Sequence, residues 1–400
     1  MILRPDYIEM IKPFMDKPFV KILVGVRRSG KSTILQMLKD EIASSGVNIS
    51  NIFEKNYSHI SDNGKDMTSE NMYEELKQFT QGKHKCYLFL DEVQEVDGWE
   101  KAINTILEEC KTDIYITGSN SKLMSSEIAT YLTGRYVSIP VFPLSFKEFL
   151  NFKNIPESKS KEAIDEYIRL GGFPIIAISD FDDKSAYQVV EGIYSSVITK
   201  DISKRHKITD KDLFDRVVQY IIENMGKTFS ANSIVKFLKN EQRKFSVETV
   251  YNYLKWLTEA FIVYPCKRYD LQGKQVLQTQ EKYYLSDVAF KYSQFGFNGK
   301  MVAAVMENIV FLELKRRGYD VSIGKNGTKE IDFVAAKRDE KIYVQVCRTI
   351  PEDSKREFEN LAEIKDNYPK YVVSLDTFAG GNENGIKSVH LADFLLLKEY

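Results

Sequence analysis

The chain has 400 residues, of which 43% are hydrophobic and 28% are charged, and its formal net charge is −1. This is the composition of a globular protein, and the length suggests two to three domains. The charge balance excludes a polycation that coats nucleic acid along its whole length, so any such binding must come from a local patch. No apolar run is long enough to span a bilayer, the first residues lack the pattern of a signal peptide, and the cysteines are widely spaced. We therefore expect a cytoplasmic protein with reduced thiols and no contact with a membrane.

Residues 25–32 read GVRRSGKS, a complete phosphate-binding loop of the pattern GxxxxGK[ST]. A β-branched apolar run precedes the loop at 19–24, and apolar residues at helical spacing follow it, so the loop joins a predicted strand to a predicted helix. In such a loop the backbone N–H groups wrap the phosphates, Lys31 reaches the β- and γ-phosphates, and Ser32 ligates Mg²⁺. The residues expected to bind nucleotide are Gly25, Val26, Arg27, Arg28, Ser29, Gly30, Lys31, Ser32 and Thr33. We therefore predict ATP and Mg²⁺ as cofactors.

A second motif is an apolar run at 86–90 that ends in Asp91 and Glu92. It predicts a buried parallel strand that delivers two carboxylates to the ligand edge of an open α/β sheet. We expect Asp91 to hold Mg²⁺, and Glu92 to orient or deprotonate the water that attacks the γ-phosphate. The alternative is a strand that ends in a solvated acidic turn.

Two further candidates follow along the chain. Asn120 comes after a short predicted strand, where it can hydrogen-bond the γ-phosphate or the attacking water; the alternative is a turn asparagine. Arg135 lies just before another predicted strand and can stabilise transition-state charge as an arginine finger, in trans if the protein assembles into a ring. A structural ion pair is the alternative for Arg135. The predicted catalytic residues are thus Glu92, Asn120 and Arg135.

The chain resembles the AAA+ superfamily ATPases of bacteria and archaea that carry a C-terminal domain of unknown function. The matching segments are GVRRSGKS at 25–32, LDEVQ at 90–94, ITGSNS at 116–121, Gly134-Arg135, PLSF at 143–146 with Glu148 and Phe149, and GGFP at 171–174. The resemblance covers nearly the whole chain. It implies an ATPase fold and nucleotide binding, and it implies little about the cellular task.

We predict an α/β protein of four parts. Residues 1–152 form the P-loop AAA+ core, with its parallel sheet, and residues 153–206 a helical lid. Residues 207–292 form a winged helix, and residues 293–400 a restriction-endonuclease-like domain. Within the lid, the GGFP segment is either a hinge or a turn.

The predicted winged helix consists of three amphipathic helices and a β-hairpin around a polar turn at 272–274. Nine Lys or Arg and four Asp or Glu lie between positions 227 and 274, a balance of +5 in a chain whose total is −1. On the third helix we place Tyr251 on the apolar face. The residues expected off that face, where they could meet a DNA groove, are Thr249, Asn252, Tyr253 and Lys255. The alternative is a winged helix that makes protein contacts.

The last hundred residues show the element order of a restriction-endonuclease-like core. That family needs acids for Mg²⁺ and a lysine that orients water. Glu307 and Asp332 fit the acids, but the third strand carries Gln345 and Cys347 where a carboxylate and a lysine are required. We therefore expect a catalytically degenerate domain kept for structure or contacts.

These predictions favour an AAA+ ATPase that hydrolyses ATP to ADP and phosphate, and thereby drives or switches the interaction of its C-terminal domains with a partner. Self-assembly into a homo-oligomer is part of this hypothesis. The alternative is an ATP-regulated nucleic-acid-binding protein that acts through the winged helix with little hydrolysis.

Overall fold

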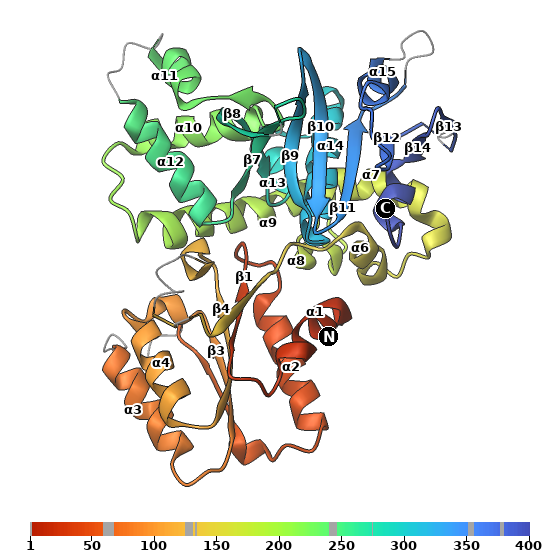
Figure 1. Cartoon of the computed structure of the whole chain (residues 1–400). Helices are drawn as coiled ribbons and strands as arrows, with labels where there is room; N and C mark the ends of the chain where they lie inside the picture. Colours follow the sequence, from red (N-terminus) through yellow and green to blue (C-terminus); the bar gives the residue numbers. More distant parts are fainter. Residues whose placement is uncertain are drawn as a thin grey trace. The chain divides into compact units, whose positions relative to one another are not determined.

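A computed structural model describes residues 2–58, 68–124, 131–132, 134–239, 246–273, 275–350, 356–376 and 380–400. The chain divides into two compact units (Figure 1). The N-terminal unit comprises Met1–Val141 with Glu259–Phe261, and the C-terminal unit comprises Phe142–Thr258 and Ile262–Tyr400. Lys274, in the predicted polar turn, lies outside the described residues.

The N-terminal unit contains a five-stranded sheet in the order β2-β3-β4-β1-β5, with every neighbouring pair parallel. Its strands are β1 (Val20–Val24), β2 (Ile52–Asn56), β3 (Cys86–Asp91), β4 (Thr112–Gly118) and β5 (Tyr136–Pro140). Its helices include α1 (Pro5–Ile11), α2 (Lys31–Ser44), α3 (Ser69–Thr80) and α4 (Trp99–Glu109). Helix α2 covers one face of the sheet, and α3 and α4 cover the other (Figure 1). Burial on both faces explains why β1 and β3 are almost continuously apolar.

This topology places the loops that follow β1, β3 and β4 at one edge of the sheet. Because the strands are parallel, their carboxyl ends point the same way, and β4 lies between β1 and β3. Ligands of open α/β sheets bind at this edge. The predicted order of strand, loop and helix around residues 19–44 is confirmed by β1 and α2.

A buried ion pair lies near the opposite, amino-terminal edge of the sheet. Lys21 on β1 donates a hydrogen bond to Asp113 on β4 and a second, of 2.9 Å, to the Phe19 carbonyl oxygen. The Tyr115 hydroxyl and the Asp16 backbone N–H both donate to Asp113 Oδ2 at 2.8 Å. Lys21 and Asp113 are at most 1% exposed, so their charges depend on each other and on these hydrogen bonds.

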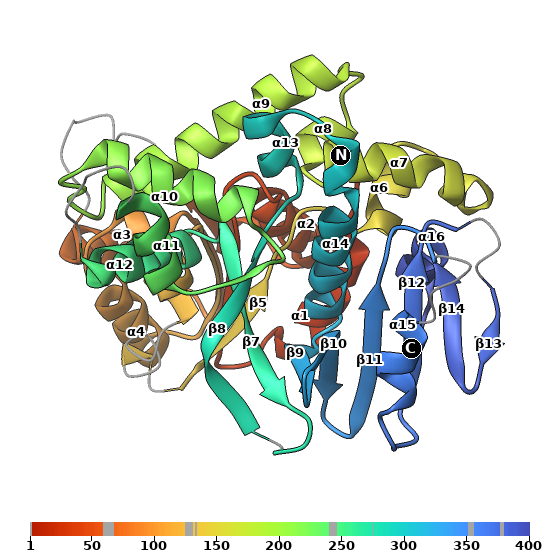
Figure 2. The same cartoon turned by 90° about the horizontal axis from the view of Figure 1, so that it is seen from above.

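The C-terminal unit contains a nine-stranded sheet in the order β13-β14-β12-β11-β10-β9-β7-β8-β6. Its strands are β6 (Thr228–Phe229), β7 (Val263–Asp270), β8 (Gln275–Leu285), β9 (Asp320–Asn326), β10 (Lys329–Lys337), β11 (Glu340–Val346), β12 (Lys370–Ser374), β13 (Asn382–Glu383) and β14 (Ile386–His390). Figure 2 shows the strands following one another from β8 to β13. The β7–β8 hairpin is joined to the strands after residue 293 by parallel pairing of β7 with β9. The predicted boundary at 292 therefore falls inside one compact unit.

Along the sequence, the helices of the C-terminal unit lie before, between and after the strands of this sheet. They are α6 (Phe146–Phe152), α7 (Ser160–Leu170), α8 (Pro174–Ala177), α9 (Asp183–Ser196), α10 (Lys211–Glu223), α11 (Ala231–Lys239), α12 (Val247–Glu259), α13 (Ala289–Phe295), α14 (Val302–Arg316), α15 (Arg356–Ala362) and α16 (Leu391–Leu396). The assignments of a lid and a winged helix to these elements stay predictions.

The apolar face of α12 differs from the predicted one. Tyr253 is 2% exposed and packs edge-to-face on Phe214, whereas Tyr251 is 54% exposed. The buried positions of this helix are Val250, Tyr253, Leu254 and Leu257, which follow the i, i+3, i+4, i+7 spacing of a single face. The prediction that Tyr253 is available to a DNA groove was therefore wrong, while Asn252 and Lys255 are exposed.

The GGFP segment is tightly packed against other residues of the C-terminal unit. Gly171 adopts φ +72°, and a Cβ there would overlap the Asp287 carboxylate. Gly172 donates its backbone N–H to Asp287 Oδ2 at 2.7 Å, and its carbonyl accepts the Leu144 N–H at 2.6 Å. A Cβ at Gly172 would come within 2.4 Å of the Leu144 carbonyl oxygen, so glycine is required at both positions, and the hydrogen bonds link the GGFP segment to the PLSF segment.

We expect Asp113→Ala to lower the free energy of unfolding of the N-terminal unit by about 3–5 kcal/mol, because it leaves the buried Lys21 ammonium without its counter-charge. The chain has one tryptophan in each unit, Trp99 and Trp256. Urea unfolding followed by fluorescence in a Trp256→Phe background therefore reports on the N-terminal unit.

The matched control for this measurement is Lys39→Ala. It removes one partner of a more exposed ion pair, in which Lys39 Nζ lies 2.5 Å from Glu54 Oε2. Such pairs contribute under about 1 kcal/mol. If Asp113→Ala and Lys39→Ala lower the free energy of unfolding equally, the buried pair is no more stabilising than the exposed one.

Candidate functional site

The loop at 25–30 is shaped by two glycines. A Cβ at Gly25 would overlap the carbonyl oxygen of Val141, which follows β5 and donates its N–H to Val24 O at 2.6 Å. Gly30 adopts φ +98°, in the left-handed region that favours glycine, and immediately precedes the first residue of α2. The chain can therefore turn sharply from β1 into the N-terminus of α2, where backbone N–H groups face a prospective anion.

Lys31 lies over the loop with its ammonium group turned back onto the backbone. Its Nζ donates to Gly25 O at 3.0 Å and to Val26 O at 3.1 Å, and the residue is 4% exposed. Ser32 and Thr33 are exposed on the first turn of α2. The Ser29 hydroxyl is buried, and the described part of the chain gives it no hydrogen-bond partner. The loop thus offers a cation, exposed hydroxyls and an unsatisfied donor, a set that fits a magnesium-bound phosphate chain.

Arg4 supports the loop from outside the motif. Its Nη1 donates to the Ser29 carbonyl oxygen at 2.8 Å, and its guanidinium lies 4.6 Å from the centroid of the Tyr7 ring. Arg4 is only 2% exposed. A buried arginine therefore holds the loop backbone in place, and no local sequence pattern indicated it.

Both oxygens of the Asp91 carboxylate are oriented by neighbouring strand ends. Asn56, the last residue of β2, donates its amide to Asp91 Oδ2 at 2.7 Å. Thr117 on β4 donates its hydroxyl to Asp91 Oδ1, and the same hydroxyl oxygen accepts the Glu92 backbone N–H at 3.0 Å. Asn56 and Thr117 were missed from the sequence, although Thr117 belongs to the ITGSNS segment. The result is a fixed carboxylate at the edge where an Mg²⁺ ligand is expected.

Glu92 and Asn120 lie on adjacent turns at the same edge. Glu92 follows β3 with φ +56°, and Asn120 follows β4; the two residues are 8% and 1% exposed. Gln94 and Ser119 both donate hydrogen bonds to Glu92 Oε2. The structure thus brings the phosphate-binding loop, Asp91, Glu92 and Asn120 to one edge of the parallel sheet.

Arg135 lies at the opposite edge. It precedes β5, and its carbonyl oxygen accepts the N–H of Val20, the first residue of β1, at 2.9 Å. Its guanidinium donates to Asn104 Oδ1 at 2.9 Å and to Glu108 Oε1 at 2.7 Å, both on α4. Because the strands are parallel, the length of β1 separates Arg135 from its own phosphate-binding loop. This placement excludes contact with a phosphate in the same subunit and leaves a role in trans or a structural ion pair.

The acids of the predicted nuclease-like core surround a lysine. Lys282 Nζ lies 2.9 Å from both Glu307 Oε1 and Glu330 Oε1, and 4.0 Å from Asp332 Oδ1. Burial disfavours the charged lysine, but the three carboxylates outweigh burial and raise the pKa of Lys282. Gln345 accepts the Asp332 N–H at 3.3 Å. In the described residues, no group of three or more His, Cys, Asp or Glu side chains is arranged to hold a metal ion.

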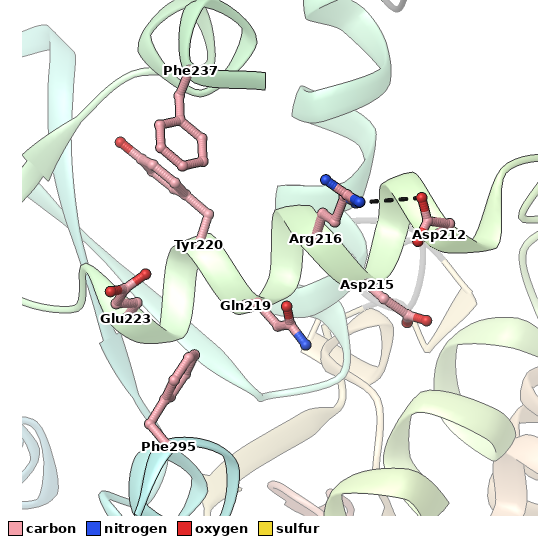
Figure 3. Close-up of a pocket in the computed structure, with 8 residues that line it drawn as sticks. All are labelled: Asp212, Asp215, Arg216, Gln219, Tyr220, Glu223, Phe237 and Phe295. Atoms are coloured by element: carbon pink, nitrogen blue, oxygen red, sulfur yellow. Dashed lines mark ion pairs between the residues drawn. The ribbon is translucent and has the colours of Figure 1, made fainter. Parts of the chain in front are cut away.

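A surface pocket of about 480 Å³ lies along α10 (Figure 3). Tyr220 and Phe237 lie together at one end, with their ring centroids 4.9 Å apart, and Phe295 lies across the helix (Figure 3). Arg216 pairs with Asp212 at 3.3 Å. Its lining consists of acidic, aromatic and amide side chains with one arginine, and it includes no residue of the phosphate-binding loop.

None of the helices in the described residues combines the length and the apolar character that a membrane crossing requires.

The family comparisons agree with this geometry. Residues 17–150 match the model of an AAA domain, and residues 161–300 match that of a domain of unknown function. An uncharacterized protein of Haemophilus influenzae is 37% identical over 399 residues, which cover 99% of each chain. An uncharacterized protein of Methanocaldococcus jannaschii is 30% identical over 354 residues, which cover 84% of this chain and 76% of that one.

Among solved structures, a Walker-type ATPase of Pyrococcus abyssi superposes with a TM-score of 0.51 at 14% identity, over 73% of this chain and 95% of that chain. At this identity the likeness concerns the fold, and it confirms the predicted α/β architecture of a P-loop ATPase. The chain therefore belongs to the same family as the Haemophilus and Methanocaldococcus proteins, and its residues 17–150 match an AAA domain.

Proposed function

We propose that the protein binds ATP with Mg²⁺ and hydrolyses it to ADP and phosphate at the carboxyl edge of the N-terminal sheet. The observation that carries this proposal is the meeting of two motifs: a GxxxxGKS loop after β1 and an Asp91-Glu92 pair after β3, at one edge of an all-parallel sheet. The AAA family match supports the same activity.

Each side chain has a physical task in this proposal. The loop N–H groups and the Lys31 ammonium bind the phosphates, since charge-assisted donors bind anions most strongly. The Ser32 hydroxyl and the Asp91 carboxylate would hold Mg²⁺, which when bound supplies positive charge that offsets the charge of the phosphates. Glu92 accepts a proton from the attacking water, and Asn120 donates its amide to that water or to the γ-phosphate.

Hydrolysis would drive or switch the contact of the C-terminal unit with a partner. Exposed aromatic side chains such as Phe237 and Tyr251 on this unit suit a protein partner. DNA binding is the second candidate, favoured by the basic balance between residues 227 and 274. ATP turnover measured with single- and double-stranded DNA and RNA distinguishes the two kinds of partner. Turnover should respond to nucleic acid only if nucleic acid is the partner.

Lys31→Ala is expected to weaken ATP binding about 10- to 100-fold, because it removes a charge-assisted contact of roughly 1.5–3 kcal/mol. Isothermal titration calorimetry with ATP and Mg²⁺ measures the change. The matched control is Lys39→Ala on the same helix, whose ammonium pairs with Glu54. Equal ATP affinity in Lys31→Ala and in the control would show that the nucleotide binds elsewhere.

Glu92→Gln is expected to bind ATP like the wild type and to hydrolyse it about 10²- to 10⁴-fold more slowly, because the amide keeps the shape and loses the base. Phosphate release under saturating ATP measures turnover. Glu74→Gln, an exposed position on α3, controls for the loss of one carboxylate from the surface. Wild-type turnover in Glu92→Gln would exclude Glu92 as the activating group.

Arg135 is proposed as an arginine finger for a neighbouring subunit. Arg135→Ala should then retain ATP affinity and lose roughly 10³- to 10⁵-fold in turnover, and the specific activity of the wild type should rise with protein concentration. Glu108→Ala is the informative control, because it breaks the ion pair with Arg135 and leaves the guanidinium in place. If Glu108→Ala loses as much turnover as Arg135→Ala, or if a monomer by light scattering is fully active, the role in trans is disproved.

A further inference from the structure

The carboxylate of Glu92 is held through one of its two oxygens. The Gln94 amide and the Ser119 hydroxyl both donate to Glu92 Oε2, the latter at 3.5 Å. The Gln94 amide also lies 3.5 Å from Ser119 Oγ, which closes a triangle of three side chains. Among the residues that the structure describes, none donates a hydrogen bond to Glu92 Oε1.

The backbone fixes this triangle. Gln94 is the middle residue of the 3-10 turn Val93–Glu95, which follows Glu92 directly, and the Glu92 N–H is bound to the Thr117 hydroxyl. The Gln94 side chain lies against Gly118 at the end of β4, where an added Cβ would come within 2.6 Å of Gln94 Oε1. The amide therefore reaches Glu92 from a turn anchored between β3 and β4, not from a mobile surface position.

Such an arrangement affects how a carboxylate can act as a base. When two donors bind the same oxygen, the rotation of the carboxylate is restricted and the other oxygen points in a defined direction. A catalytic base needs such a fixed orientation, because displacement of a reacting atom by about 1 Å can cost roughly 10²-fold in rate. The amide of Gln94 restrains the carboxylate without adding a charge. A lysine or arginine at the same position would form an ion pair with Glu92 and make it a weaker base.

We propose that Gln94 is a positioning residue, which holds Glu92 through Oε2 so that Oε1 faces the attacking water. This inference rests on the proposed function, ATP hydrolysis with Glu92 as the base. Gln94 acts through Glu92 and not on the nucleotide, so its loss lowers kcat and leaves the affinity for ATP unchanged.

The test uses Gln94→Met in the full-length chain, which keeps the length of the side chain and removes both amide donors. We expect kcat to fall roughly 10- to 100-fold, with the Kd for ATP within about twofold of the wild type. The control is Gln78→Met, the same substitution at an exposed position of α3. The second arm repeats Gln94→Met in a Glu92→Gln background, where it should change kcat no further, because residues that act as a unit are not additive.

The outcomes separate this inference from the proposed function. An equal loss of kcat in both backgrounds would indicate a general structural role and overturn the positioning role. An unchanged or increased kcat in Gln94→Met, with normal wild-type turnover, would overturn the inference and leave the proposed function intact. Wild-type protein that binds ATP through Lys31 but never hydrolyses it would overturn the proposed function and this inference with it.

Discussion

The parallel direction of all five strands in the N-terminal unit is the constraint on which the candidate site depends. It gathers the ends of β1, β3 and β4 at one edge, so that residues from three distant segments share a site. It also places Arg135 and the buried pair of Lys21 and Asp113 near the other edge. The parallel topology thus separates the groups proposed to bind the nucleotide from the ion pair that stabilises the sheet and from Arg135, which is proposed to act on a neighbouring subunit.

The sequence predicted the parts of this site that are local. The loop at 25–32, the acids after β3 and Asn120 after β4 each lie within a short motif, and the structure places them together. The residues that orient them could not be assigned in this way. Asn56, Thr117 and Arg4 act through contacts between segments far apart in the chain, which only the folded sheet creates. Gln94 lies inside the LDEVQ motif, but its contact with Glu92 depends on a side chain that folds back across a 3-10 turn.

Two charged residues show where patterns of hydrophobicity fail. Lys21 is a charged residue within an apolar strand, and it is fully buried because Asp113 on the neighbouring strand supplies its counter-charge. Lys282 lies in the predicted hairpin, and its partners Glu307 and Glu330 come from the predicted next domain. Neither pairing is visible in the chain, since both depend on which strands become neighbours. The exchange of Tyr251 and Tyr253 on α12 is a smaller failure, in which two aromatic residues two positions apart were assigned to the wrong sides of the helix.

The pairing of β7 with β9 has a consequence for how this unit can be divided. The two strands are paired in parallel, with Arg268 opposite Ile323 and Asp270 opposite Lys325, so each protects an edge of the other. A chain cut at residue 292 would leave the free side of β7 as an unprotected sheet edge, and such edges promote aggregation. The hairpin and the C-terminal strands therefore depend on each other for a closed sheet, and removing either one exposes the edge of the other.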